Sequence, residues 1–374
     1  MIKRAYNLGD LVQPNKVLVI YGPRRVGKTT LLNTYLSGIK AKYKLDSGDN
    51  IRVQQALSSQ DFNNITEYAS GYDLIAIDEA QQVPNIGMGL KIIVDQIPNI
   101  KVIATGSSSF DLAGAVGEPL TGRKTTITLY PIAQMELISK YNRHELKEKL
   151  EEFLVFGSYP EAVTAKSRKD KITILEELVS SYLLKDVLAL DRVKSSKVLL
   201  DLLKLIAFQT GSEVSLNELA TQLKLDVKTI GRYLDIFEKA FIIKRIGGFS
   251  RNLRKEIVSK AKYYFLDNGV RNAVISQFNP LDSRNDIGIL WENFMVTERI
   301  KKCAYQNIYG SFYFWRTYDR QEVDMVEERE GKLYGYEFRW SAKDKMKAPK
   351  DWQKTYANAE LKLINRENYL DFIL

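Results

Sequence analysis

Cysteine and histidine are almost absent from this sequence. Its 374 residues include one cysteine, Cys303, and one histidine, His144. A single cysteine excludes a disulfide within the chain, and one residue of each kind excludes a Cys/His zinc site, because structural zinc takes four such ligands. Hydrolases built on a serine–histidine or cysteine–histidine pair are also disfavoured. We therefore expect any catalysis to use carboxylates, Lys, Arg, Ser or Thr, together with a metal such as Mg²⁺.

Long apolar runs are also missing. No stretch approaches the ~18 apolar residues of a membrane span, and residues 1–9 contain no apolar core of a signal peptide. A cytoplasmic protein that does not enter the membrane is the expectation. The hydrophobic fraction of 45% and the charged fraction of 27% are ordinary for a globular protein. This length predicts two or three domains.

The net charge of +9 favours a polyanionic partner. Lys and Arg that contact phosphates release counterions, which drives nucleic-acid binding. Charge alone is equally compatible with simple solubility. DNA is therefore a candidate partner that needs support from particular residues.

Short apolar runs predict the fold of the first third. The run KVLVIY at 16–21 is rich in β-branched residues and predicts a buried strand, and a glycine-bearing loop and a helix follow it. Strands alternating with helices indicate a parallel α/β sheet with helices on both faces. Helical periodicity then dominates from about 144 to 240, and strands return from 262. We predict three units, 1–135, 136–255 and 256–374. Further strands of the first unit are predicted at 41–45, 73–77, 101–105 and 124–129.

One loop matches the phosphate-binding pattern G-x-x-x-x-G-K-[ST] in full. It lies after a strand and before a helix, where backbone N–H groups and the helix N-terminus can surround phosphate oxygens. Lys28 should reach the β- and γ-phosphates of ATP, and Thr29 should bind Mg²⁺. The predicted nucleotide-binding residues are Gly22, Pro23, Arg24, Arg25, Val26, Gly27, Lys28, Thr29 and Thr30.

Two acids follow the strand at 73–77. Asp78 is placed to hold Mg²⁺ through water, and Glu79 to polarise the attacking water as a general base. An Asp-Glu pair after a strand can also cap the next helix. The loop at 22–29 upstream favours the catalytic interpretation, which predicts hydrolysis of ATP and not binding alone.

Three further positions belong to the predicted ATPase site. The strand at 101–105 should lie beside the strand of the phosphate loop, so that Ser107, or else Thr105, senses the γ-phosphate; helix capping is the alternative for either hydroxyl. Arg123 is a candidate for stabilising the transferred phosphoryl group in cis or from a neighbouring subunit, or it is a surface arginine. Arg24 and Arg25 contact phosphates or pair with neighbouring acids.

Taken in order, these segments resemble archaeal and bacterial AAA-type ATPases. The motifs are GPRRVGKT, LIAIDEAQ, IATGSSSF, LTGRK and LYPIAQMEL. The later segments GSYPEAV, YYFLDNGV, LWENFMVTE, FYFWR and EVDMV resemble the C-terminal domain of unknown function that accompanies those ATPases. The resemblance implies an additional-strand, catalytic-glutamate P-loop core, then a winged helix, then a nuclease-like fold.

The middle unit has the pattern of a winged helix. Ser215 begins a helix at 215–225, Asp226 begins a second at 227–240, and a strand with a Gly-Gly turn follows at 241–248. If the unit binds DNA, the second helix enters a groove and basic residues near the wing meet phosphates; packing against protein is the alternative. The predicted DNA contacts are Lys228, Thr229, Arg232, Lys244, Arg245, Arg251 and Arg254.

The last unit places acids in the order of a restriction-endonuclease-like site. Glu292 lies on a predicted helix, and Asp324 and Glu337 lie on successive strands. Such sites bind Mg²⁺ through carboxylates and use a lysine near the attacking water. Here Arg339 stands at the lysine position, and arginine stays charged and cannot act as a base. Lys343, further along the chain, is a candidate to replace the missing lysine. The site is therefore predicted to be degenerate, with a structural or DNA-binding role.

Three functions remain open at this point. The first is an oligomeric motor, as large as a hexamer, in which ATP hydrolysis drives action on branched or forked DNA. The second is an ATP-controlled switch in signalling or defence, with the winged helix as an interaction module. The third is a nuclease gated by ATP, which Arg339 disfavours.

Overall fold

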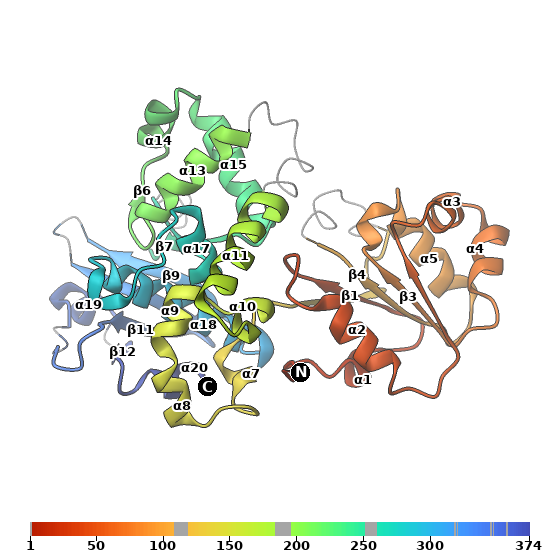
Figure 1. Ribbon diagram of the computed structural model, residues 1–374, viewed down its shortest axis with the longest axis horizontal. Helices are drawn as coiled ribbons and strands as arrows, with labels where there is room; N and C mark the ends of the chain where they lie inside the picture. The colour runs from red at the N-terminus through yellow and green to blue at the C-terminus, as the bar shows by residue number, and fades with distance from the viewer. Residues whose placement is uncertain are drawn as a thin grey trace.

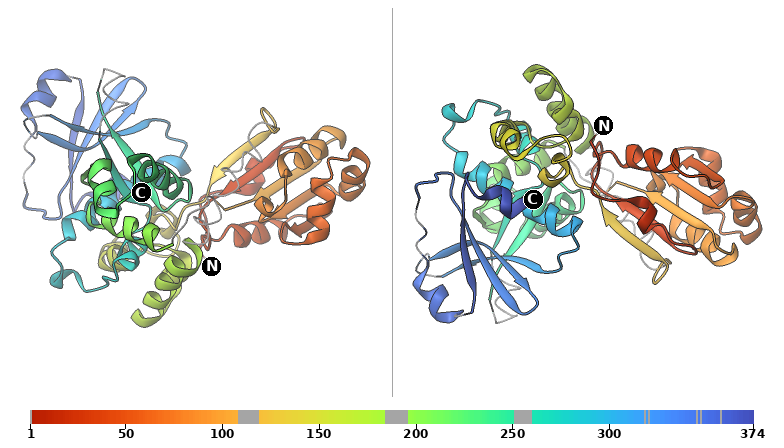
Figure 2. Two further views of the ribbon diagram at one scale, coloured as in Figure 1. Left: turned by 90° about the horizontal axis from the view of Figure 1, so that it is seen from above. Right: turned by 90° about the horizontal axis from the view of Figure 1, so that it is seen from below.

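The computed structural model describes residues 2–107, 119–183, 196–250 and 260–374, apart from residues 318, 320, 345, 347 and 357. The first unit lies at one end of the molecule, and the helices and strands that follow residue 130 lie at the other (Figure 1). Views from above and below show the same separation (Figure 2). The N-terminus lies between the two parts (Figure 1).

The first sheet is parallel throughout, in the order β2-β3-β4-β1-β5. The prediction of a parallel α/β sheet is confirmed, and β4 lies beside β1 as expected, with β3 on its other side. Such an order brings the carboxyl ends of β1, β3 and β4 together, and the residues that follow these ends form the candidate site. The strands are β1 (Val17–Tyr21), β2 (Tyr43–Ser47), β3 (Leu74–Asp78), β4 (Lys101–Thr105) and β5 (Lys124–Thr128).

Alternation along β1 explains why the sheet has helices on both faces. Leu18 and Ile20 pack in one core with the helix that follows the loop, while Val17 and Val19 pack in a second core on the opposite face. Successive side chains of a strand point to opposite faces, so an unbroken apolar run needs helices that cover both faces of the sheet. The first face carries α1 (Leu8–Leu11) and α2 (Lys28–Leu36); the second carries α3 (Ile51–Ser58), α4 (Phe62–Ala69) and α5 (Ile86–Gln96).

Helices dominate the middle of the chain, as the periodicity predicted. A pair of helices separated by a three-residue turn, α14 (Leu216–Leu223) and α15 (Val227–Lys239), is capped by Ser215 and Asp226, which accept hydrogen bonds from backbone N–H groups of the first turns. The other helices are α7 (Gln134–Leu137), α8 (Arg143–Glu148), α9 (Leu150–Phe156), α10 (Pro160–Thr164), α11 (Arg168–Glu177) and α13 (Ser196–Phe208), with a π-helical segment at Leu178–Leu183.

A second sheet joins the helix pair to the C-terminal fold. Its order is β12-β11-β10-β9-β7-β8-β6, and β7 pairs with β9 through Gly247 opposite Tyr313 and Gly248 opposite Phe314. The predicted boundary at 255/256 therefore falls between two strands of one sheet; the division into units stays a prediction. The strands are β6 (Glu213–Val214), β7 (Ile243–Gly248), β8 (Ala261–Phe265), β9 (Ser311–Arg316), β10 (Glu322–Arg329), β11 (Lys332–Phe338) and β12 (Glu360–Ile364).

A long helix forms the centre of the C-terminal part. In α18 (Ile287–Tyr305) the buried residues occur on every side, and fully buried Trp291 stacks edge-on against Trp340 and Tyr369. A helix that is buried all round belongs to the interior. The remaining helices are α17 (Asn268–Val274), α19 (Lys350–Thr355) and α20 (Tyr369–Ile373), with a short 3₁₀ turn at Leu281–Ser283.

Candidate nucleotide site

The phosphate-binding loop has the conformation that its sequence predicts. The loop leaves β1 at Gly22, where a Cβ would lie 2.2 Å from the carbonyl oxygen of Leu129, so that only glycine fits. Gly27 has a φ of 94° and caps α2. The Lys28 side chain is buried, and its Nζ donates to the carbonyls of Gly22 (2.8 Å) and Pro23 (2.9 Å). The ammonium therefore lies within the loop itself, where a phosphate would replace carbonyl contacts with stronger ones.

Three polar side chains meet where β3 and β4 end beside the loop. The Thr29 hydroxyl donates to Oδ2 of Asp78 (2.7 Å), and the Thr105 hydroxyl donates to the other carboxylate oxygen. The backbone N–H of Glu79 donates to Oγ1 of Thr105 (3.2 Å). Hydroxyl and carboxylate oxygens are the donors that Mg²⁺ prefers. The pair Thr29 and Asp78 therefore fits an ion held jointly with the phosphates of a nucleotide.

Glu79 adopts an unusual backbone conformation. Its φ of 50° and ψ of 42° lie in the left-handed region, which costs roughly 1–2 kcal/mol for a residue with a Cβ. It begins the 3₁₀ turn Ala80–Gln82, and its carboxylate accepts a hydrogen bond from the Gln81 amide. Strain of this kind concentrates at functional sites. The turn ends β3 at Asp78, and the Gln81 amide holds the Glu79 carboxylate.

The two predicted hydroxyl sensors lie at the carboxyl end of β4, which is the end of the sheet where the phosphate loop begins. The N–H of Gly106 donates to the carbonyl of Ile20 (3.0 Å), so the end of β4 lies beside the end of β1. Ser107 follows at once and is fully buried. Thr105 contacts Asp78 directly. Of the two, Thr105 is thus hydrogen-bonded to Asp78 of the predicted metal site, while Ser107 lies two residues further along the chain.

The arginines of the predicted site separate in the structure. Arg25, with a left-handed φ of 63°, pairs with Glu161 (3.3 Å) and Glu177 (3.7 Å) of the following helices, which agrees with pairing to acids. Arg24 is half-buried in the loop. Arg123 precedes β5 and forms an ion pair with Asp95.

Strand direction decides where Arg123 can act. Its carbonyl accepts from the N–H of Val17, at the amino end of β1, whereas the phosphate loop follows the carboxyl end of β1. A five-residue strand spans about 16 Å. Arg123 therefore lies at the amino ends of the strands, whereas its own phosphate loop lies at their carboxyl ends. The prediction that Arg123 stabilises the phosphoryl group of its own subunit is therefore wrong. Its action on a neighbouring subunit stays a prediction.

A cavity of about 810 Å³ opens beside the loop. Its walls come from residues 2–8, from Val26 and Gly27, from the exposed side of α2, and from Pro160, Glu161 and Thr164 of the following part. Small-molecule sites commonly have volumes of ~300–1,000 Å³. The cavity is therefore large enough for a nucleoside whose phosphates enter the loop.

The helix pair exposes a basic face on α15. Lys228 and Arg232 are exposed, one turn apart. Thr229 instead takes part in the helix cap: its N–H and its hydroxyl both donate to the N-cap residue Asp226, which lowers the pKa of that carboxyl group.

Near the turn between β7 and β8, the predicted DNA contacts are partly occupied. Lys244 pairs with Glu238 (2.8 Å). Arg245 contacts Tyr263: burial raises the pKa of the Tyr263 phenol, and the charge of Arg245 and its hydrogen bond oppose this rise. Arg251 and Arg254 lie outside the described residues. Of the predicted contacts that the structure describes, Lys228 and Arg232 are the ones that lie exposed on α15.

The C-terminal acids do come together, and their partners are cations. Arg339 donates to Glu337 Oε2 (2.7 Å) and to Asp324 Oδ2 (3.2 Å). Glu292 accepts from the Tyr264 hydroxyl (2.8 Å) and lies 3.7 Å from Nζ of Lys262. Lys262, from β8, also pairs with Glu322. Lys343 is exposed and joins none of these pairs.

Lys262 is a functional candidate that no sequence pattern indicates. It is a single lysine in the otherwise apolar strand run AKYYF, yet it is 2% exposed and lies among the acids. Burial raises the pKa of Glu292 to about 7, opposed by Lys262, and burial also raises the pKa of Glu337 to about 8, aided by Asp324. Within the described part of the chain, no group of three or more Asp, Glu, His or Cys side chains is arranged to hold a metal ion.

Comparison with known families agrees with the first sheet and its loop. Residues 14–138 match the family model for an AAA domain. These residues form an AAA-type P-loop ATPase domain. Two domains of unknown function match the rest of the chain, DUF8612 over residues 147–281 and DUF4143 over residues 287–369. The AAA domain thus ends where the long helical part begins, and the first of the two later matches spans position 255.

Several relatives of the whole chain are themselves uncharacterised proteins. Rv2008c of Mycobacterium tuberculosis is 27% identical over 86% of this chain and 70% of its own length. A protein of Haemophilus influenzae is 28% identical over 74% of each chain. MJ1544 of Methanocaldococcus jannaschii is 26% identical over 95% of this chain and 84% of its own length. The likeness to these relatives therefore extends beyond the AAA domain over most of the chain.

Solved structures with detectable likeness are more distant. A Signal Transduction ATPase with Numerous Domains from Pyrococcus horikoshii, with a tetratricopeptide repeat sensor, is 15% identical with a TM-score of 0.31, covering 81% of this chain and 46% of that one. The replication initiator DnaA, bound to AMPPCP and single-stranded DNA, is 15% identical with a TM-score of 0.28, covering 60% and 83%. Among the described residues, no helix is both long and apolar enough to cross a membrane.

Proposed function

We propose that the AAA domain binds and hydrolyses ATP, with the nucleoside in the cavity beside α2 and the phosphates in the loop at 22–29. The contacts of Lys28 with two loop carbonyls support this, because they place an ammonium where phosphate oxygens would replace the carbonyls. Thr29 and Asp78 would hold Mg²⁺, which neutralises phosphate charge when bound. Glu79 orients and deprotonates the attacking water.

We further propose that ATP turnover acts on DNA through α15. The observation that carries this proposal is the exposed pair Lys228 and Arg232 on the second helix of a capped helix pair, in a chain of net charge +9. In a winged helix this is the helix that enters a groove. Lys228 and Arg232 would contact DNA, and the motor would be oligomeric if Arg123 serves a neighbouring subunit.

A four-arm assay tests the motor directly. ATP hydrolysis is measured with no DNA, with single strands, with duplex and with a four-way junction. A motor on branched DNA predicts stimulation by the junction above that by duplex. Equal rates in all four arms would refute DNA-coupled hydrolysis while leaving the ATPase itself intact.

A charge-reversal pair tests α15 itself. Lys228→Glu with Arg232→Glu should lower DNA affinity and reduce the salt dependence of binding by about two phosphate contacts. Exposed Lys166 and Lys169, next to and on α11, provide a charge-matched control when both become Glu. Equal losses in the two double variants would mean that net charge alone is responsible, and α15 would lose its assigned role.

A nucleotide-controlled switch is the second candidate. The pairing of Arg25 with Glu161 and Glu177 favours it, because a phosphate bound in the loop would compete with these acids for the guanidinium. The switch predicts that ATP changes the oligomeric state, without DNA stimulation or unwinding. Size measurements with ADP and with a non-hydrolysable ATP analogue would separate switch from motor.

The ATP-gated nuclease has less support. Arg339 occupies the carboxylates of Glu337 and Asp324, and raised carboxyl pKa values weaken metal binding because metals bind the ionised form. A Mg²⁺-dependent nicking assay with Asp324→Ala as control addresses it. Cleavage that survives this substitution would come from another site.

A further inference from the structure

A buried arginine that no sequence pattern places in the site contacts the phosphate loop and lines the cavity beside it. Arg4 lies in the N-terminal segment, and its side chain is 9% exposed. Its Nη1 donates to the carbonyl of Val26 (2.6 Å), and its Nη2 donates to the carbonyl of Tyr130 (2.6 Å). Its Nε donates to Oε1 of Glu136 (2.9 Å). One guanidinium therefore joins the N-terminal segment, the middle of the loop and the strand exit after β5.

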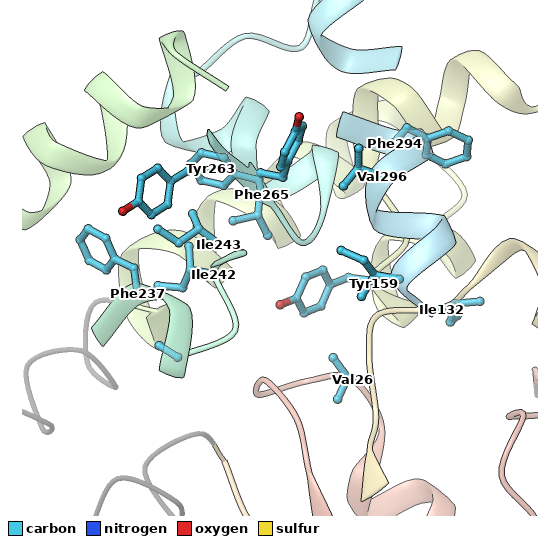
Figure 3. Packing of buried hydrophobic residues seen from close by; sticks show 14 of the residues in the cluster. Val26, Ile132, Tyr159, Phe237, Ile242, Ile243, Tyr263, Phe265, Phe294 and Val296 are labelled. Carbon is cyan, nitrogen blue, oxygen red and sulfur yellow. The ribbon is translucent and has the colours of Figure 1, made fainter. Parts of the chain in front are cut away.

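The contact with Val26 fixes the orientation of a peptide group. Phosphate loops bind anions through backbone N–H groups, so their carbonyls must point away. Rotation of the peptide between Val26 and Gly27 would turn a carbonyl toward the phosphate and an N–H away from it. The Val26 side chain is also buried, in one cluster with Ile132 and Tyr159, and Figure 3 shows it at the side of the cluster that faces the AAA domain. Arg4 thus holds the carbonyl of Val26, and this cluster holds its side chain.

Glu136 keeps Arg4 in place. Its side chain is fully buried, and besides Arg4 it accepts from the N–H of Ala5 (2.7 Å) and of Ala133 (2.9 Å). Both carboxylate oxygens are therefore occupied by groups whose positions the backbone fixes. A charge-assisted pair of this kind is more directional than a lysine could supply, since the guanidinium donates along several fixed directions.

The long helix α18 also contacts this arginine. The hydroxyl oxygen of Tyr305, the last residue of α18, accepts from Nη2 of Arg4 (3.2 Å) and from the N–H of Tyr130 (3.0 Å). The same helix places Glu298, which accepts from the N–H of Gln134 (2.6 Å) and pairs with Lys301. Lys301 also donates from Nζ to the carbonyl of Ile132 (3.4 Å), so α18 holds the backbone at 130–134 at three points.

We propose that Arg4 is a positioning residue for the phosphate loop, and that Tyr305 makes this positioning depend on α18. Arg4 keeps the Val26 carbonyl out of the phosphate cradle, and displacement of α18 removes one of its supports. The C-terminal part therefore regulates nucleotide affinity through Tyr305 and Arg4. The inference rests on the proposed nucleotide site and adds a route by which the rest of the chain controls it.

Three variants of the full-length chain test this route. Arg4→Lys keeps the charge and loses the several fixed donors, Tyr305→Phe removes only the hydroxyl, and the double variant combines them. The dissociation constants of ADP and of pyrophosphate are measured, the latter by competition with a fluorescent ADP analogue. Arg271→Ala is the matched control, because Arg271 is another buried arginine, which contacts the Ala207 carbonyl and Asp286 far along the chain from the loop.

The expected changes differ between variants. Arg4→Lys should weaken ADP and pyrophosphate by at least about tenfold each, and Tyr305→Phe by about three- to tenfold. The double variant should weaken binding by less than the product of the two factors, because both act through one contact. KM for ATP should rise more than kcat falls. Arg271→Ala should lower thermal stability while leaving ADP affinity unchanged.

Several results would overturn the inference. Unchanged ADP affinity in Tyr305→Phe would remove α18 from the route, even if Arg4→Lys fails to fold. Weakened ADP with unchanged pyrophosphate would mean that Arg4 acts on the nucleoside in the cavity and not on the phosphate cradle. A wild-type chain that binds ADP without hydrolysing ATP would refute the proposed hydrolysis alone. A wild-type chain that binds neither probe would refute the proposed site and this inference together.

Discussion

Replacing Glu292 with glutamine should change how the stability of the C-terminal part depends on pH. Burial raises the pKa of Glu292 to about 7 from an ordinary 4.5, against the opposing charge of Lys262. Between these values the folded chain retains a proton that the unfolded chain releases, so stability is fully present below the unfolded pKa and falls as pH rises through the folded pKa. The 2.5-unit difference corresponds to about 3 kcal/mol.

Glutamine retains an acceptor for the Tyr264 hydroxyl and removes the titration. Lys262 keeps Glu322 as a partner in the variant. The wild-type chain should lose stability between pH 4 and pH 8, and the variant should lose about 3 kcal/mol less over the same range. Glu337, whose pKa is raised to about 8, continues to act in the same direction in both proteins.

Urea denaturation followed by tryptophan fluorescence measures this difference in the relevant part of the chain. All of the tryptophans, Trp291, Trp315, Trp340 and Trp352, lie beyond residue 290. Glu360→Gln serves as the control, since Glu360 is 55% exposed and pairs only with Lys362 among the described ion pairs. If Glu292→Gln and Glu360→Gln show the same pH dependence as the wild type, Glu292 does not hold a proton in the folded state.

The remaining predictions concern the nucleotide site. Lys28→Ala should reduce ATP hydrolysis by at least about a hundredfold, and a steady-state rate near that of the wild type would refute the site. Glu79→Gln should bind ADP normally and hydrolyse ATP about a hundredfold or more slowly; equal losses of binding and rate would assign it a structural role. Arg123→Ala should leave the ADP affinity of the monomer unchanged, and calorimetry at low protein concentration checks this.

The first sheet follows from its local sequence. The β-branched run before Gly22, and the apolar runs before Asp78 and Gly106, each have one stable arrangement, buried on both faces between helices. The carboxyl ends then converge, so Thr29, Asp78 and Thr105 meet even though 76 residues separate the first from the last. The same parallel topology places Arg123 at the opposite end of the strands, because Arg123 precedes β5 whereas the phosphate loop follows β1.

Other features depend on contacts that no local pattern records. The pairing of β7 with β9 joins segments more than sixty residues apart through two glycine-containing registers. Arg4 lies in a segment without periodicity, and its importance comes from carbonyl groups of Val26 and Tyr130, which carry no side-chain signal. Lys262 is explained only by acids contributed by α18 and β10.

The shared seven-stranded sheet determines how movement can pass through the molecule. Turning the helix pair away from the C-terminal fold would break the ladder between β7 and β9 and the bond from the Phe249 N–H to the Phe314 carbonyl (2.6 Å). Because these bonds would have to break for the two to part, we expect the helix pair and the C-terminal fold to move as one body.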